Sequence, residues 1–290
     1  FTIGFNLVER YKLDVESSER STFNVQLITG LASTALMLIL GNLGTIRAVW
    51  MGFQKIAAPG GTVGDANIFQ RFVWGLDGFA KTLTGIPLSI GQGEWYWLPS
   101  RVIPAPNDVE PITEFPLFTF LYSDLHAHMI VLPLTLFMIA WGLSFVLFLR
   151  NTQYVVRGTF AVVRDAALPI LLGALVLGAI YPTNTWDAFT YIPLTAIAVG
   201  YALFNVMDFK DNRLNLPPLL LRLAFAAAGA LTLVLLSRIF YQPYFYWFGS
   251  GYGQVDPWTG AHTPLTSYFT HWGVFLFLIF AWMVWETRKI

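Results

Sequence analysis

The sequence predicts an all-α fold, a polytopic membrane helix bundle with about six transmembrane helices and an additional helix in the outer interface. Hydrophobic residues make up 56% of the chain and charged residues only 12%, against about 25% charged in a typical soluble domain. Apolar runs recur that approach the roughly 20 residues needed to cross a bilayer. Aromatic residues reach 17%, with 11 Trp, as in interfacial belts. We therefore expect an integral, multi-pass protein of the plasma or cytoplasmic membrane.

Charge and cysteine content exclude several functions. The formal net charge is zero and the chain has no Cys. No basic surface is indicated, so no nucleic-acid partner is expected, and disulfides, thiolate metal sites and cysteine nucleophiles are excluded. The chain begins at Phe1 without a signal-peptide pattern. We expect residues 1–290 to form a single membrane domain and to be a fragment of a longer chain.

Six apolar segments are predicted to cross the membrane in order. They lie near residues 24–50, 128–149, 166–181, 187–206, 217–241 and 268–286. The third is short, because Pro182 is expected to stop it, and Pro169 is expected to bend it.

The distribution of Lys and Arg orients these spans. Basic residues concentrate in connections 150–165 and 207–222 and at both chain ends, which places these parts, including both termini, on the cytoplasmic side. The connections 51–127, 182–186 and 242–267 then face outward.

The 51–127 connection is an elaborated outer-face segment, too long for a simple loop. Apolar positions from Ile68 to Leu83 recur at helical spacing, and Asp65 can cap the start. We expect a helix over residues 66–83 lying in the outer interface; the alternative is a helix packed on the bundle.

Ser123-Asp-Leu-His-Ala-His128 sets an acid and two histidines directly before a long apolar run. If a helix starts here, Ser123 caps it and Asp124 and His128 share a face, a pair suited to proton transfer. If the segment is extended, Asp124, His126 and His128 share a side and could hold a divalent metal. The alternative is a capped helix start with interfacial histidines. Whether a metal is a cofactor stays open.

Two further outer segments carry candidate binding residues. Asn184, Trp186 and Asp187 lie between spans three and four; amide, indole and carboxylate suit a sugar, although capping of the next helix by Asn184 or Thr185 also accounts for them. Arg101 follows a run of aromatic residues and suits bidentate phosphate binding, the alternative being an ion pair with Asp108 or Glu110.

Five motifs together resemble a known family. Leu40-Gly-Asn-Leu43, Trp97-Leu-Pro-Ser-Arg-Val-Ile-Pro104, Ile112-Thr-Glu-Phe-Pro116, Ser123-Asp-Leu-His-Ala-His128 and Thr183-Asn-Thr-Trp-Asp187 occur in the order of the YYY membrane protein family, which is similar to the GT-C glycosyltransferases. The family usually has Gly and Pro where this chain has Ser123 and Ala127. The triple-tyrosine segment and the acidic first outer loop are absent, so the chain resembles the C-terminal part of such a protein.

The resemblance implies a membrane glycosyltransferase, or part of one, that takes a sugar from a polyprenyl-phosphate donor at the outer face. Asp124, His126 and His128 would then be catalytic, and substrate would be bound by Arg101, Glu114, Asn184, Trp186 and Asp187. An upstream chain or another membrane subunit would supply a further carboxylate. The alternative is a non-catalytic subunit of a larger membrane complex. A transporter is disfavoured, since few ionisable residues lie mid-span.

Overall fold

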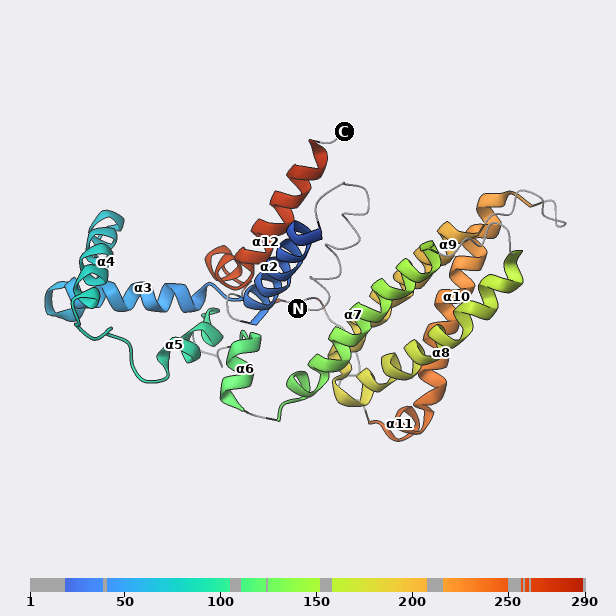
Figure 1. The fold of residues 1–290 in the computed structure, drawn as a ribbon. Coiled ribbons are helices and arrows are strands. Elements are labelled where there is room, and N and C mark those ends of the chain that lie inside the picture. The colour runs from blue at the N-terminus through green and yellow to red at the C-terminus, as the bar shows by residue number, and fades with distance from the viewer. Residues whose placement is uncertain are drawn as a thin grey trace. The chain divides into compact units, whose positions relative to one another are not determined.

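The structure is a computed structural model, and the part of it described here is helical, without strands (Figure 1). It describes residues 19–38, 41–104, 111–123, 125–151, 158–207, 216–249, 257, 259–260 and 262–288. The chain divides into two compact units: unit 1 comprises 1–124 and 258–290, and unit 2 comprises 125–257. Each is considered by itself, and the expectation of a single membrane domain stays a prediction.

The described residues contain five helices that are long and apolar enough to cross a membrane. This confirms the predicted class, an all-α membrane helix bundle. Four are in unit 2 and one in unit 1. They are α7 (Ala127–Asn151), α8 (Gly158–Thr183), α9 (Thr185–Val206), α10 (Pro218–Phe240) and α12 (Leu265–Thr287). The last five predicted spans thus correspond to these helices.

The first predicted span, 24–50, is wrong as one continuous helix. Two helices replace it, α2 (Glu19–Leu38) and α3 (Gly44–Ala57). The Asn42 carboxamide oxygen accepts a hydrogen bond from the Gly44 backbone N–H at 2.7 Å, so this side chain satisfies a donor at the start of α3. Asn favours such local bonds over a helix interior, so Asn42 is compatible with a break at this position.

The third span is longer than predicted. The prediction that Pro182 stops it is wrong, because α8 includes both Pro169 and Pro182 and ends at Thr183. Prolines are tolerated in membrane helices when neighbours satisfy the freed backbone groups. The Trp141 indole N–H of α7 donates to the Pro169 carbonyl at 3.1 Å, a bond that links α7 to α8.

Unit 1 contains the predicted helix of the outer connection as α4 (Ile68–Leu83). Its cap is Asn67 rather than the predicted Asp65, and Asn67 forms a capping box with Gln70. The apolar positions of α4 are exposed: Ile68, Phe69, Phe72, Val73, Leu76, Phe79 and Leu83. The buried Gly75 and Gly78 instead lie against Trp50 and Phe53 of α3. The interfacial position of α4 stays a prediction.

Short elements complete unit 1. They are the 3-10 helices η2 (Pro59–Gly61) and η3 (Leu98–Arg101) and the helices α5 (Glu94–Trp97) and α6 (Pro116–Tyr122). Phe115 and Phe118 are buried around α6, and the ring of Phe118 lies 6.0 Å from that of Trp97. This contact joins α6 to the last residue of α5, directly before η3.

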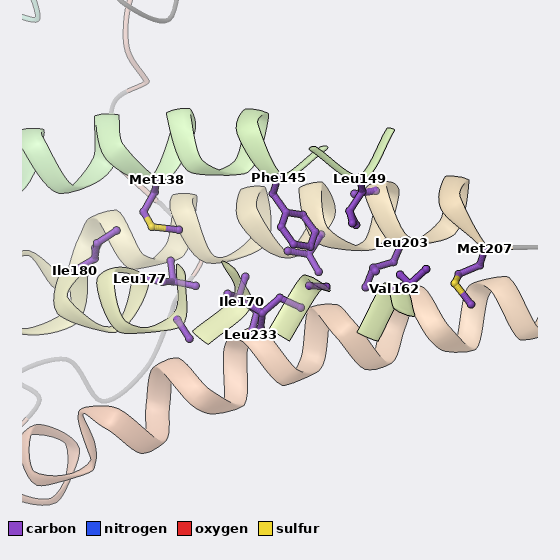
Figure 2. Close-up of a cluster of buried hydrophobic side chains, with 14 of the residues drawn as sticks. Met138, Phe145, Leu149, Val162, Ile170, Leu177, Ile180, Leu203, Met207 and Leu233 are labelled. Atoms are coloured by element: carbon purple, nitrogen blue, oxygen red, sulfur yellow. The ribbon is translucent and has the colours of Figure 1, made fainter. Parts of the chain in front are cut away.

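Unit 2 is a four-helix bundle of α7–α10, extended by the short α11 (Gln242–Trp247). Its core is a continuous set of apolar side chains that all four helices contribute (Figure 2): among them Met138, Phe145, Leu149, Val162, Ile170, Leu177, Ile180, Leu203, Met207 and Leu233. Small residues permit close packing. A Cβ at Gly173 would collide with the Trp141 ring.

Candidate functional site

Three of the motifs meet in unit 1 at the backbone of η3. The Asn42 amide nitrogen donates to the Pro99 carbonyl at 2.6 Å, and the Thr113 hydroxyl donates to the same carbonyl at 3.1 Å. The Thr113 N–H donates to the Ser100 carbonyl at 2.8 Å. Asn42 and Ser100 are fully buried. Buried polar groups of this kind fix one conformation only when satisfied, so these bonds determine where η3 lies.

The same network reaches α12. The Asn42 amide also lies 3.3 Å from Nδ1 of His271, and the Leu43 N–H donates to the Thr270 carbonyl at 2.8 Å. Gly44 is required here, because a Cβ at this position would lie 2.9 Å from the Pro99 Cα. The start of α3, η3 and the first half of α12 are thus held together.

Arg101 is oriented by its immediate neighbours. Its Nη1 donates to the Ser100 carbonyl at 3.0 Å and lies 2.9 Å from the Ser100 hydroxyl. Its Cζ lies 4.5 Å from the centre of the Trp97 ring, a distance at which the cation is attracted to the ring face. A guanidinium fixed in this way loses less conformational freedom when it binds an anion.

A cavity of about 380 Å³ opens beside Arg101. A second cation, Arg47 of α3, lines it, together with the apolar side chains of Met51, Leu98 and Val102 and the polar Ser267 of α12. Among the described residues, none that lines this cavity is acidic. Within the described residues neither arginine has a carboxylate partner. We call this the arginine cavity.

Two arginines over an apolar wall suit one kind of ligand. Guanidinium groups bind phosphate by paired hydrogen bonds, while Met51, Leu98 and Val102 offer contact to hydrocarbon. An amphipathic molecule with an anionic head satisfies both parts of the lining.

Glu114, a predicted substrate-binding residue, adjoins this network without lining the cavity. It follows Thr113 directly, and its Oε2 accepts a hydrogen bond from the Thr119 hydroxyl at 3.2 Å. The described geometry therefore gives Glu114 a role at the start of α6, and contact with a substrate stays a prediction.

In the motif of residues 123–128, the structure differs from the prediction that a helix starts at Ser123. Ser123 does not cap α7: it is in the left-handed region, with φ 54°, at the end of α6. α7 starts at Ala127, and the His126 carbonyl accepts from the N–H groups of Met129 and Ile130. Asp124 lies outside the described residues.

The two histidines lie side by side in unit 2. The ring centres of His126 and His128 are 4.5 Å apart, with His126 directly before α7 and His128 in its first turn. No group of three metal-ligating side chains occurs among the described residues. With Asp124 outside that set, a metal role for Asp124, His126 and His128 stays a prediction.

The second outer motif of unit 2 is organised around Asp187. Asn184 occupies the cap position of α9, as predicted, but its side chain makes no capping bond. Instead its amide donates to Oδ2 of Asp187 at 2.8 Å. Trp186 is exposed and lies 6.0 Å from Phe189, ring to ring. An exposed indole beside an amide–carboxylate pair fits sugar recognition and also fits an interfacial belt.

His128 and Asp187 are at the same end of the unit 2 bundle, since α7 and α9 run in the same direction (Figure 1). Arg101 and Glu114 belong to unit 1. Because Asp124, His128 and Asp187 all lie near the starts of spans that are expected to begin on the same side, we predict that they converge on one outer-facing cavity.

Sequence reasoning missed Arg47, Asn42 and Ser267 as members of the unit 1 site. Arg47 and Asn42 are polar residues inside the apolar run 24–50, which hydropathy predicts to be one span. Their polarity within that run was the available signal.

The helices and the amphipathic cavity define a polytopic helical membrane protein. Residues 1–289 match a family model described as "Uncharacterized membrane protein (DUF2298)". The chain therefore belongs to this membrane protein family. No curated protein and no solved structure matches it.

Proposed function

We propose that the protein is a GT-C-like membrane glycosyltransferase, or part of one, that uses a polyprenyl-phosphate-linked sugar donor at the outer membrane face. The arginine cavity is the observation that supports this proposal. Arg47 and Arg101 bind the donor phosphate, and the apolar wall contacts the first part of its chain.

The main requirement of this reaction for the two arginines is positive charge beside the donor phosphate. Transfer releases a lipid phosphate, and two positioned guanidinium groups stabilise the negative charge that develops on that leaving group. The described lining contains no carboxylate that would compete for the arginines, and this increases the effect.

The other steps of the reaction are assigned to the two sequence motifs of residues 123–128 and 183–187. In this proposal Asp124 is the base or a metal ligand, His126 and His128 bind metal or phosphate, and Asn184 and Asp187 bind sugar hydroxyls. A divalent metal, if bound, would supply Lewis-acid stabilisation of phosphate oxygens.

Binding of a radiolabelled polyprenyl-phosphate sugar to the full protein in nanodiscs tests the proposal. A charge-assisted hydrogen bond contributes about 1.5–3 kcal/mol, so Arg47→Gln or Arg101→Gln should weaken binding by about 10- to 100-fold. Arg288→Gln, an exposed arginine after α12, is the matched control and should bind normally. Absence of binding by the wild-type protein, or equal binding by all variants, would contradict the proposal.

A second candidate, a non-catalytic subunit of a larger membrane complex, has support from α12. Ser267 is the one buried residue among those described in this helix, and large apolar side chains such as Phe277, Phe280 and Trp282 are exposed along it. Such a surface could contact partner helices. Lipid-linked sugar binding without transfer, in a preparation that retains its partner subunits, would favour this candidate.

A further inference from the structure

A groove of about 560 Å³ lies along the α8 and α10 faces of unit 2. One wall runs from Val163 to Leu171 of α8 and the other from Phe225 to Leu236 of α10, and the buried Leu203 of α9 closes the inner side. Gly229 is part of this surface, where a Cβ would collide with Leu203. The groove therefore belongs to the membrane-spanning part of the bundle.

The lining of this groove is hydrocarbon. Thr232 is its one residue with a side-chain hydroxyl, and that hydroxyl donates to the Ala228 carbonyl of its own helix at 2.8 Å. Apolar cavities without unsatisfied polar groups do not retain water. An occupant must therefore be an apolar chain.

One arginine lies at the start of each wall. α8 and α10 run in the same direction, since α9 returns between them (Figure 1). Arg164 directly follows the lining residue Val163 of α8, and Arg222 is three residues before the lining residue Phe225 of α10, so each arginine is within about one helical turn of the first residue of its wall. Both come early in their helices, and they therefore lie at the same end of the groove.

Both arginines contact neighbouring residues at that end. Nε of Arg222 donates to the Phe204 carbonyl at 2.8 Å, and its Cζ lies 4.2 Å from the Phe204 ring centre. Nε of Arg164 pairs with Oδ1 of Asp165 at 2.8 Å, with the Arg164 side chain 61% exposed. Among these three described side chains, two guanidinium groups and one carboxylate give a net positive charge.

We propose that the groove binds one acyl chain of an anionic phospholipid, whose headgroup phosphate is held between Arg164 and Arg222. The charge at one end and the hydrocarbon lining along the rest match the two parts of such a lipid. The Lys and Arg distribution predicts that this end is cytoplasmic, where anionic lipids are concentrated. The proposal is independent of the glycosyltransferase activity.

Photolabelling of the full protein in nanodiscs tests this site. The probe is phosphatidylglycerol with a diazirine in one acyl chain, compared with phosphatidylcholine carrying the same chain, and the labelled peptides are mapped by mass spectrometry. We expect labelling of residues 163–171 and 225–236 with a preference for phosphatidylglycerol. At about 1 kcal/mol per arginine near the surface, Arg164→Gln should lower that preference about fivefold.

Groove-filling variants separately test binding of the acyl chain. Ala167→Leu and Ala228→Leu place bulk in the groove at positions that are exposed within the chain, and each should reduce labelling by both probes. Ala227→Leu, also exposed but outside the lining, is the matched control. Labelling spread evenly over all exposed helices, unchanged labelling in both filled variants, or equal labelling by the two lipids overturns the proposal.

Discussion

The side-chain amide of Asn42 and the carbonyl of Pro99, 57 positions apart, are joined by a buried hydrogen bond of 2.6 Å. This bond connects the break between α2 and α3 to the short helix that carries Arg101. The orientation of one wall of the arginine cavity therefore depends on a residue that does not line it.

Asn42→Ala should destabilise unit 1 and weaken ligand binding to the arginine cavity. The substitution leaves the Gly44 N–H without its Asn42 acceptor and removes one of two donors to the Pro99 carbonyl. A loss of about 1–3 kcal/mol in the free energy of unfolding is expected, measured by thermal unfolding in detergent. Asn205→Ala removes an exposed amide that bonds to the Tyr201 carbonyl of its own helix and should cost little. Equal losses in the two variants would show that the Asn42 network is not special.

Gly173→Ala should destabilise the unit 2 bundle. An added Cβ collides with the Trp141 ring, and moving that ring disturbs the bond from its indole to the Pro169 carbonyl. Overpacking of this kind typically costs about 1–3 kcal/mol. Gly142→Ala is the matched control, because its Cβ would meet the Ala198 Cβ at an ordinary 3.5 Å. Thermal unfolding should rank Gly173→Ala below both Gly142→Ala and the wild type.

Single cysteines at positions 157 and 256 should be labelled from opposite sides of the membrane. The native chain has no Cys, so Arg157→Cys and Asp256→Cys each introduce the one reactive thiol. The prediction follows from the Lys and Arg asymmetry of the connections. Labelling by a membrane-impermeant maleimide on sealed vesicles of known orientation checks it, and modification of both positions from the same side would overturn the topology.

Asp124→Asn should abolish sugar transfer while leaving the protein folded in the membrane. Asn retains the shape and the acceptor oxygen of Asp but not the charge that a base or metal ligand needs. Loss of one positioned base costs about 10²–10⁴ in rate. Sugar transfer is measured with a preparation of the protein in which the wild type is active. Asp77→Asn, at an exposed ion pair of α4, is the control. Normal transfer by Asp124→Asn would remove this residue from the catalytic set.

Composition and periodicity were enough to predict the helical membrane class and the positions of α7 to α10 and α12. Long apolar runs have few alternatives in a bilayer, because each backbone group must be satisfied within its own helix. The α4 prediction succeeded for a related reason: its apolar positions repeat at helical spacing, and that pattern does not depend on distant contacts.

The arginine cavity and the helix break at Asn42 could be identified only from the tertiary structure. An apolar run interrupted by Gly41 and Asn42 remains compatible with one continuous helix until Pro99, from far along the chain, supplies an acceptor for the Asn42 amide. Arg47 likewise reads as an isolated cation until η3 brings Arg101 to the same cavity. Hydropathy and spacing report on local conformation, whereas a binding site depends on which distant segments meet, and here buried hydrogen bonds determine that meeting.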